Sequence, residues 1–341
     1  METSNFVIVG ENIHATRSLK LNGKRITHTD EGNQFINYLD KSNTPQLMQI
    51  PEWFKKTQPY SQGQIKHFMI AIMNLREADL NIRLEGEKYI QTEVEKQIKA
   101  GANYIDINID EVHYDLNIQK DCMAKVVKII QKYSSIPLSI DSSNSEIIES
   151  GLKACANSNI KPMINSVAFE RPEVFDMALK YQAKIIAMAT NESGMPESAK
   201  DRVDNAVKII EKATSLGFSL NDIYLDAIIF PISVNAQYGN HYFDAVQEIR
   251  NQYGKELYIG MGLSNVSFGM PMRKLINQAF IYLGLKSGIN AGILDPVQIK
   301  LNEINNIDIN SKKFELAINM LTGKDEFCMN YLKAYRDGDL N

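Results

Sequence analysis

From about residue 100 onward, short apolar runs alternate with polar turns and longer amphipathic stretches. Short apolar runs bounded by turn residues are typical of buried strands, and a 3.6-residue period is typical of helices. Repeated strand and helix units predict a parallel sheet covered by helices. With one N-terminal run included, the candidate strands are 6–11, 104–109, 137–141, 162–166, 183–189, 223–226, 257–263 and 291–294.

Eight strands is the number that closes a (β/α)8 TIM barrel, an α/β fold. Signals for helix ends fit the same scheme, because Ser143 or Asn144 can cap a helix, and Gly101, Gly217 and Gly288 can each end one. An open, doubly wound sheet shows the same alternation. The periodicity alone therefore leaves both architectures open.

Two regions depart from a minimal barrel. Residues 17–80 are rich in Asn, Gln, Lys and Thr and contain the only tryptophan, Trp53, which predicts an insertion after the first strand. A loop at that position emerges at the catalytic end of a barrel, so the insertion is either a lid or partner-docking surface, or an excursion packed on the side. The amphipathic stretch 312–336 predicts a C-terminal helical extension, 301–341, after a barrel domain spanning 1–300.

Composition narrows the function little. The net charge is only -4 and the basic residues are spread along the chain, so nothing indicates nucleic acid or a membrane surface as a partner. No apolar run is long enough to span a bilayer and no signal-peptide pattern is found, so we expect a cytoplasmic protein. Three widely spaced cysteines, Cys122, Cys155 and Cys328, fit neither a disulfide framework nor a thiolate zinc site, and are expected to be buried and reduced.

Amide and carboxylate side chains follow six of the eight apolar strand cores. Any one of them, Asn144 in particular, could simply cap the next helix. Six on one rim would cost roughly 1 to 3 kcal/mol per unsatisfied group unless water or a polar ligand met them. Because the set has few cations, it suits a neutral planar heterocycle with amino and keto edges, such as a pterin. The segments are 10–12, 106–108, 141–144, 165–166, 226 and 262–265.

Other chemistries find no pattern in the chain. There is no GxxxxGK[ST] loop, and Gly260 and Gly262 lack the third glycine of a dinucleotide fingerprint. The five histidines show no HExxH or paired spacing, so no protein-bound metal is expected. No GxSxG elbow supports covalent acyl chemistry.

Several of these segments resemble the pterin-binding domain of methyltetrahydrofolate:corrinoid methyltransferases. They also resemble the folate domain of cobalamin-dependent methionine synthase. The resemblance covers about residues 100–297, with Gly10 and Glu11 as an N-terminal outpost. GLSNVS at 262–267 is specific, whereas the other blocks alone are weak. The remaining blocks are IDSSN at 140–144, PMINS at 162–166, YLD at 224–226, Arg273, Asn277 and AGILDP at 291–296.

The resemblance implies a role for each matching residue. Asp141, Asn165 and Asp226 would hold the edge of the pterin ring, and Asn265 would lie near the methyl-bearing nitrogen, with Asn265 and Asp226 as the catalytic pair. Glu11 and Arg273 would line the same pocket, and Asp106 and Asn108 would form its floor. The sequence departs from the pattern at 268–270, FGM, where relatives carry polar residues, and in the 17–80 insertion.

The implied activity is methyl transfer between 5-methyltetrahydrofolate and the cobalt of a corrinoid (cobalamin), assisted by protonation of the methyl-bearing nitrogen. Because the chain has no DxHxxG segment, we expect the corrinoid to arrive on a partner protein. The resemblance also implies a homodimer. Two alternatives remain: a condensing enzyme of the dihydropteroate synthase type, which would place a lysine where Ser264 and Asn265 stand, and a non-catalytic folate-binding subunit.

Overall fold

The computed structural model describes residues 5–155, 160–190 and 194–340. The chain divides into two compact units, which we call the N-terminal unit (Gly10–Pro162) and the C-terminal unit (Met163–Asn341 with Met1–Val9). The strands of the eight-stranded sheet neighbour one another in the order β12-β11-β10-β9-β8-β7-β1-β13. The strands follow chain order and the last lies beside the first, which is the order of a (β/α)8 TIM barrel. A doubly wound sheet would reverse its order beside the first strand, so the barrel prediction is confirmed.

In the N-terminal unit two strands pair in parallel, with Asn108 opposite Asp141. The first of them is buried along its whole length, as expected for a strand covered on both faces. The register therefore brings two predicted site residues side by side at the carboxyl ends of their strands. The elements are β7 (Tyr104–Asn108), α5 (Leu116–Tyr133), β8 (Leu138–Asp141) and α6 (Ser145–Cys155).

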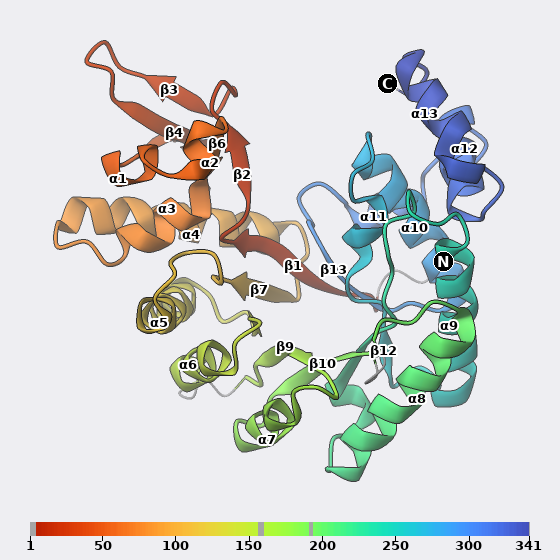
Figure 1. Cartoon of the computed structure of the whole chain (residues 1–341). Helices are drawn as coiled ribbons and strands as arrows, with labels where there is room; N and C mark the ends of the chain where they lie inside the picture. Colours follow the sequence, from red (N-terminus) through yellow and green to blue (C-terminus); the bar gives the residue numbers. More distant parts are fainter. Residues whose placement is uncertain (1–4, 156–159, 191–193, 341) are drawn as a thin grey trace. The chain divides into compact units, whose positions relative to one another are not determined.

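The region between β1 (Val7–His14) and α4 (Leu80–Lys99) consists of short antiparallel strands and short helices, and lies beside α4 (Figure 1). The antiparallel pairing was not predicted, because strands of three to six residues show too little alternation to be recognised. Its elements are β2 (Ser18–Lys20), β3 (Ile26–His28), β4 (Gln34–Leu39), β5 (Pro45–Gln49), α1 (Glu52–Lys55), α2 (Gln58–Ser61), β6 (Gln64–Lys66) and α3 (His67–Asn74).

The C-terminal unit carries the later strands and their helices, and its last two barrel strands are joined by backbone hydrogen bonds. The N–H of Ile293 donates to the carbonyl of Met261 at 2.9 Å, and that of Asn290 to Ile259 at 3.1 Å. Its barrel elements are β9 (Met163–Val167), α7 (Pro172–Lys180), β10 (Lys184–Met188), α8 (Ala199–Ser215), β11 (Ile223–Asp226), α9 (Tyr238–Tyr253), β12 (Tyr258–Ile259), α10 (Arg273–Ser287) and β13 (Ala291–Leu294).

Three predicted boundaries are wrong, each for a local reason. The first strand runs on to His14, and just beyond it the N–H of Ala15 still donates to the carbonyl of Asn108 on β7 at 2.9 Å. The seventh strand ends at Ile259 rather than residue 263, since Gly260 and Met261 take positive φ angles of 149° and 52°.

The predicted helix 312–336 is two helices, α12 (Lys312–Leu321) and α13 (Met329–Arg336), after the short α11 (Leu301–Ile304). Positive φ at Gly323, Phe327 and Cys328 interrupts it, because these backbone angles cannot continue a right-handed helix. The α12 helix packs against α9 and α10.

The predicted helix ends are confirmed. Asn144 Oδ1 accepts from the N–H of Glu146 at 2.8 Å, and Gly101, Gly217 and Gly288 have φ of 98°, 103° and 110°. The three cysteines are free and buried, as predicted.

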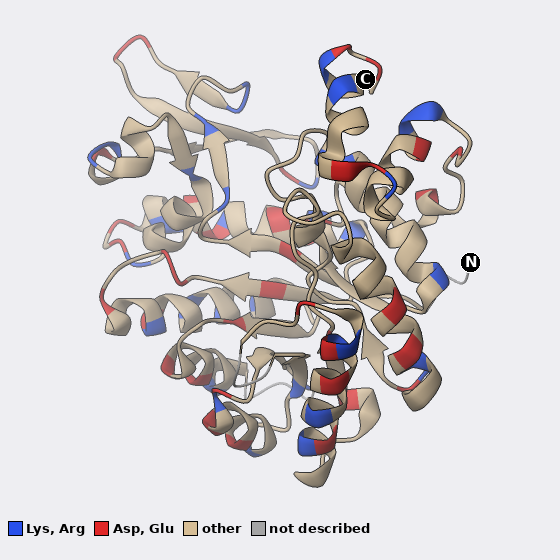
Figure 2. Cartoon of the chain, turned by 45° about the vertical axis from the view of Figure 1, so that its right-hand side comes forward, with Lys and Arg blue, Asp and Glu red and all other residues tan. Residues whose placement is uncertain are grey.

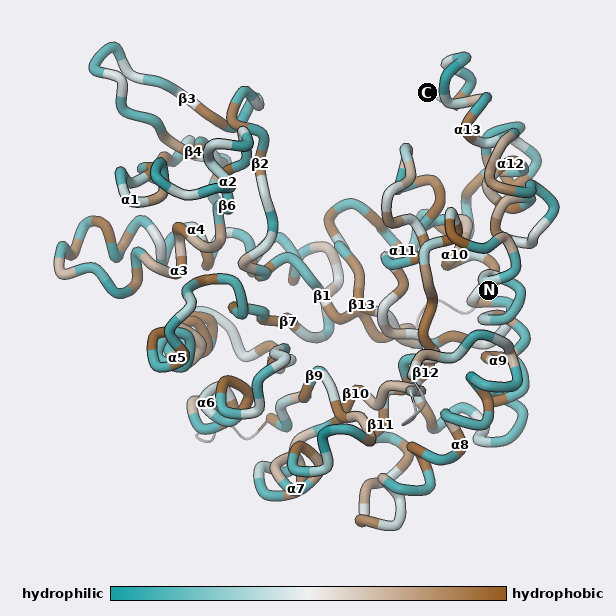
Figure 3. Tube along the Cα trace, viewed as in Figure 1, coloured by the Kyte–Doolittle hydropathy of each residue, from teal (hydrophilic) through white to brown (hydrophobic). Residues whose placement is uncertain are grey.

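Hydrophobic residues follow the strands and the inner sides of the helices (Figure 3), and charges of both signs are interspersed over the helices (Figure 2). Within the described ranges, no helix is long and apolar enough to cross a membrane.

Candidate functional site at the strand ends

The eight predicted site residues fall into one group in each unit. Asn108, Asp141 and Asp226 are the last residues of their strands and Asn265 lies in the turn after another, at the end where a barrel carries its chemistry. The N-terminal group comprises Glu11, Asp106, Asn108 and Asp141, and the C-terminal group comprises Asn165, Asp226, Asn265 and Arg273.

In the N-terminal group, Asn108 and Asp141 bond directly. Asn108 Nδ2 donates to Asp141 Oδ2 at 2.9 Å, while Asn108 Oδ1 accepts from the N–H of Asp110 at 3.1 Å. Both ends of the Asn108 amide are thus engaged, which fixes the orientation of Asp141. Asp106 is buried two residues earlier on the same strand, so it points to the same face one step deeper.

Glu11 lies inside β1 rather than at its end, and its neighbour Asn12 is the buried residue at this position. Arg17 Nη1 donates to Asn12 Oδ1 at 2.5 Å. A side chain at Gly10 would come within 2.4 Å of Gln97 Oε1, so only glycine allows the Gln97 amide to reach the Asn12 N–H. Asn12 belongs to the predicted segment 10–12, whereas Arg17 was missed because a loop Arg gives no pattern.

Asp110 was also missed. Its carboxylate accepts from Ser142 Oγ at 2.5 Å, and from the N–H and Oγ of Ser143, both at 2.8 Å. These bonds tie the loop after β7 to the loop after β8. The two serines of the IDSSN segment are therefore used to hold the loop, and Asp141 is the residue of that segment that stands at the end of the strand.

In the C-terminal group, Asp226 is the last residue of β11 and is held by backbone. Its Oδ1 accepts from the N–H of Ile228 at 3.0 Å, and the N–H of Gly262 also bonds to the carboxylate. Burial raises the pKa of Asp226 to about 6, although these two N–H groups act to lower it. A carboxyl with such a pKa can gain or lose a proton near neutral pH.

Asn265 stands beside Asp226 across the backbone of Gly262. A Cβ built on Gly262 would lie 3.0 Å from Asn265 Nδ2 and 3.3 Å from Asp226 Oδ2, so both polar groups reach this glycine from the side where a side chain would be. Asn265 lies in the short 3-10 turn Leu263–Ser267 and is exposed. The structure thus brings together the two residues predicted to be catalytic.

Arg273 and Asn165 complete the C-terminal group. Arg273 Nε donates to Ser267 Oγ and its Nη2 to the carbonyl of Ser264, both at 3.0 Å, so its guanidinium braces the turn that carries Asn265. Asn165 lies within β9 and is half-buried. Asn277, on α10, has a buried Oδ1 without a hydrogen-bond partner in the described part of the chain.

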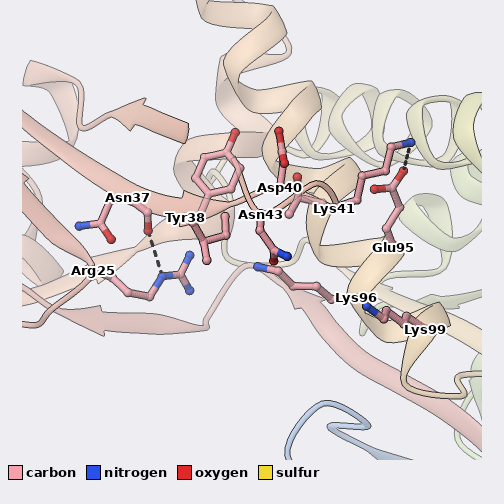
Figure 4. Close-up of a pocket in the computed structure, with 11 residues that line it drawn as sticks. Arg25, Asn37, Tyr38, Asp40, Lys41, Asn43, Glu95, Lys96 and Lys99 are labelled. Atoms are coloured by element: carbon pink, nitrogen blue, oxygen red, sulfur yellow. Dashed lines mark hydrogen bonds and ion pairs between the residues drawn. The ribbon is translucent and has the colours of Figure 1, made fainter. Parts of the chain in front are cut away.

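A separate pocket of about 480 Å³ lies in the N-terminal unit between the β4–β5 hairpin and α4 (Figure 4). Its charged groups are largely satisfied within the chain. Lys41 Nζ pairs with Glu95 at 3.3 Å, and Arg25 Nη2 donates to Tyr89 Oη at 2.7 Å. Lys96 and Lys99 occupy the last turn of α4, where the helix dipole favours cations. The charge of this pocket is therefore accounted for by local structure.

Comparisons with known proteins place the chain in a family. A family model described as pterin binding enzyme matches residues 81–295. The chain is 28% identical over 266 residues to the methylcorrinoid:tetrahydrofolate methyltransferase of Eubacterium limosum, covering 76% of this chain and 91% of that protein.

Two solved structures of dihydropteroate synthase share the fold. The enzyme from Stenotrophomonas maltophilia has a TM-score of 0.52 at 14% identity, covering 65% of this chain and 87% of that one. The enzyme from Xanthomonas albilineans, with 4-aminobenzoic acid, has a TM-score of 0.52 at 14% identity, covering 67% and 87%. The family match spans more than half of the chain, and this protein belongs to the pterin-binding enzymes.

Proposed function

We propose that this protein is a methyltransferase that moves a methyl group between N5 of 5-methyltetrahydrofolate and the cobalt of a corrinoid. The observation that carries the proposal is the pairing of Asp226, whose pKa is about 6, with the exposed Asn265 amide across Gly262. The E. limosum relative, named for this activity, is similar over most of its own length. The alternative function, that of a dihydropteroate synthase, is supported only by the similarity of the fold at 14% sequence identity.

Pterin binding is assigned to both groups of strand-end residues. Asp141, Asn165 and Asp226 would accept from the amino and ring N–H groups of the pterin, which are donors matched to carboxylate and amide oxygens. Asp106 and Asn108 would support Asp141 from below, and Glu11 and Arg273 would contact the ligand from the sides. Hydrogen bonds from the uncharged edge of the pterin ring to fixed protein acceptors contribute more to the orientation of the ring than to the strength of binding.

In the transfer step the cobalt(I) centre attacks the methyl carbon, the bond from carbon to N5 breaks, and its electron pair stays on N5. That nitrogen leaves as a neutral amine only if it carries a proton. Asp226 can hold that proton near neutral pH, and the Asn265 amide can hydrogen-bond N5 as charge changes there. In the reverse direction N5 of tetrahydrofolate attacks the methyl on cobalt, and the same groups accept the proton released.

We further assign the corrinoid to a separate carrier protein that docks as a transient partner, and propose a homodimer that works in the cytoplasm. The barrel domain would span 1–300, with 17–80 inserted after its first strand and 301–341 as a helical extension. A short-lived complex fits repeated exchange of methylated and unmethylated carrier.

The decisive experiment mixes the protein with cobalt(I) cobalamin and 5-methyltetrahydrofolate and follows the cobalt(I) absorption band. Loss of the band with matching formation of tetrahydrofolate supports methyl transfer. Folate binding without loss of the band, with either free cobalamin or a corrinoid carrier protein, would instead indicate a non-catalytic subunit. Formation of a pteroate from a pterin diphosphate and 4-aminobenzoate would overturn the proposal in favour of the condensing enzyme.

A further inference from the structure

Two buried side chains outside the predicted site grip the backbone that surrounds Asp226. The first is Arg202, in the first turn of α8, which is fully buried. Its Nε donates to the carbonyl of Ile228 at 3.0 Å, and its Nη1 to the carbonyl of Ser198 at 2.9 Å. Ile228 is the residue whose N–H bonds Asp226, so Arg202 holds the opposite side of the same residue.

The second is Tyr242 on α9, also fully buried. Its hydroxyl donates to the carbonyl of Gly260 at 3.1 Å, and the N–H of Gly260 in turn donates to Leu225 at 3.0 Å. Gly260 stands two residues before Gly262, the other backbone donor to Asp226. Each N–H that bonds this carboxylate therefore lies on a segment pinned by one buried side chain.

Both segments contain a residue whose backbone angles are energetically unfavourable and must be stabilised by its surroundings. Ile228 has φ of 58° and Met261 has φ of 52°, in the left-handed region that β-branched and bulky residues avoid. Such strain persists only where the surroundings over-determine the conformation. The bonds from Arg202 and Tyr242 supply that constraint on either side of Asp226.

Stability alone is a poor explanation for Arg202. Within the described residues its guanidinium has no carboxylate in ion-pair range, and its Nη2 has no hydrogen-bond partner. Burial lowers the pKa of Arg202, and the nearest aromatic contact is the Phe230 ring, 5.5 Å from Cζ. Burying a charged side chain costs free energy even where a carboxylate outside ion-pair range, here Asp201, acts on it, and the two carbonyls that Arg202 holds show what its burial achieves locally.

The other ionisable groups near β11 lie elsewhere on it or are engaged. Arg202 and Asp226 both act electrostatically on the Tyr242 hydroxyl, which places these three groups together. Asp201 is used in the capping box of α8, and Arg273 braces the turn 264–267. Tyr238 also acts electrostatically on Arg202, and at the amino ends of the strands Lys184 Nζ lies 5.5 Å from the ring of Tyr224 and 5.9 Å from that of Tyr258.

We propose that Arg202 and Tyr242 are positioning residues that fix the two peptide N–H donors of Asp226 and so set how tightly this carboxyl holds its proton during methyl transfer. The link to methyl transfer rests on the proposed function, whereas the effect on Asp226 does not. Weakening either donor destabilises the carboxylate relative to the acid, so each substitution should raise the pKa of Asp226.

The test is a titration of the Asp226 carboxyl in the ligand-free protein by carbon-13 NMR, with the signal assigned by its loss in Asp226→Asn. Arg202→Met and Tyr242→Phe should each make protonation more favourable, by up to about tenfold in proton affinity, or roughly one pH unit. The pH profile of methyl transfer should move to higher pH by the same amount in each variant.

Arg250 provides a matched control in the same unit. It is a partly buried arginine on α9 whose Nε donates to the Gly288 carbonyl at 2.9 Å and whose Nη1 donates to Leu257 at 2.8 Å, before the strands β13 and β12 begin. Arg250→Met should lower the melting temperature without moving the Asp226 titration.

An unchanged Asp226 titration in folded Arg202→Met and Tyr242→Phe, or an equal shift in Arg250→Met, overturns the inference. Should Arg202→Met fail to fold, the decision rests on Tyr242→Phe and on Arg202→Lys, which keeps the charge but lacks the forked guanidinium that holds both carbonyls. If the parent protein transfers no methyl group, the proposed function fails, while the titration still judges the positioning role.

Discussion

The two groups of strand-end residues differ in how their carboxylates are satisfied. In the N-terminal unit Asp110 accepts three hydrogen bonds from Ser142 and Ser143, and Asp141 accepts from Asn108. In the C-terminal unit the hydrogen-bond donors seen for Asp226 among the described residues are the backbone N–H groups of Ile228 and Gly262, and burial outweighs them to raise its pKa to about 6. One group is built from side-chain donors that keep carboxylates in place, and the other leaves a proton equilibrium poised near neutral pH.

This difference suggests a division of labour. Side-chain networks such as the one formed by Asn108 and Asp141 orient acceptors rigidly, which suits recognition of a ring that does not change during the reaction. A buried carboxyl with a raised pKa suits the place where charge changes. Substitutions of Asp226 and Asn265 should therefore alter rate and pH dependence, and those in the N-terminal group should alter affinity or stability.

The largest effect is expected for Asn265→Ala. The amide is exposed beside Asp226, so its removal should leave the fold intact. Because its hydrogen bond would strengthen as charge changes on N5, the methyl transfer rate should fall about 10²- to 10³-fold, with methylfolate affinity nearly unchanged. Single-turnover absorbance of cobalt(I) and equilibrium titration of methylfolate measure the two quantities. Equal losses in both would erase the proposed contrast between the two groups.

Asp141→Ala should act in the opposite way. It removes one acceptor for the pterin and leaves Asn108 Nδ2 without the partner it has at 2.9 Å. The affinity for methylfolate should fall by about 1 to 3 kcal/mol, roughly 5- to 150-fold, while the rate at saturating folate changes little. Calorimetric binding and saturated single-turnover rates check this. A rate loss as large as that of Asn265→Ala would show that the N-terminal group also takes part in the chemistry.

The sequence predicted the parts of this comparison that depend on local pattern. Strand ends are marked by apolar runs followed by Asp or Asn, so Asp141 and Asp226 were found at the last residues of β8 and β11. Arg202 and Tyr242 could not be found, because their bonds reach backbone carbonyls 26 and 18 residues away and depend on how helices pack on strands. In the sequence they look like ordinary members of amphipathic helices.

The raised pKa of Asp226 predicts an unusual stability effect. A carboxyl whose folded pKa lies above its unfolded value favours folding only while it is protonated, so its contribution to stability falls as pH rises from about 4 to about 6. Asp226→Asn removes this loss and should raise the free energy of unfolding at pH 7 by about 1 to 3 kcal/mol, with little change at pH 4. Denaturation in urea at both pH values tests it. If Asp226→Asn is less stable than the parent protein at pH 7, the Asp226 carboxylate is better stabilised in the folded protein than its two backbone hydrogen bonds indicate.

The smallest effect is expected for Asp110→Asn, which probes the satisfied side of the comparison. The remaining carbonyl oxygen can still accept from the N–H of Ser143, and the new amide can donate to Ser142 Oγ, since a hydroxyl serves as donor or acceptor. Only the extra strength of bonds to a charged acceptor is lost, so the free energy of unfolding should fall by about 1 kcal/mol or less. The urea midpoint should drop slightly with an unchanged slope, and the pH profile of methyl transfer should stay in place.

Asp110→Ala, which leaves three donors without an acceptor, is the matched variant and should lower the free energy of unfolding by more. A shift of the pH profile in Asp110→Asn would place a titrating group in the N-terminal unit as well, and the division between a recognising and a proton-handling group would no longer hold.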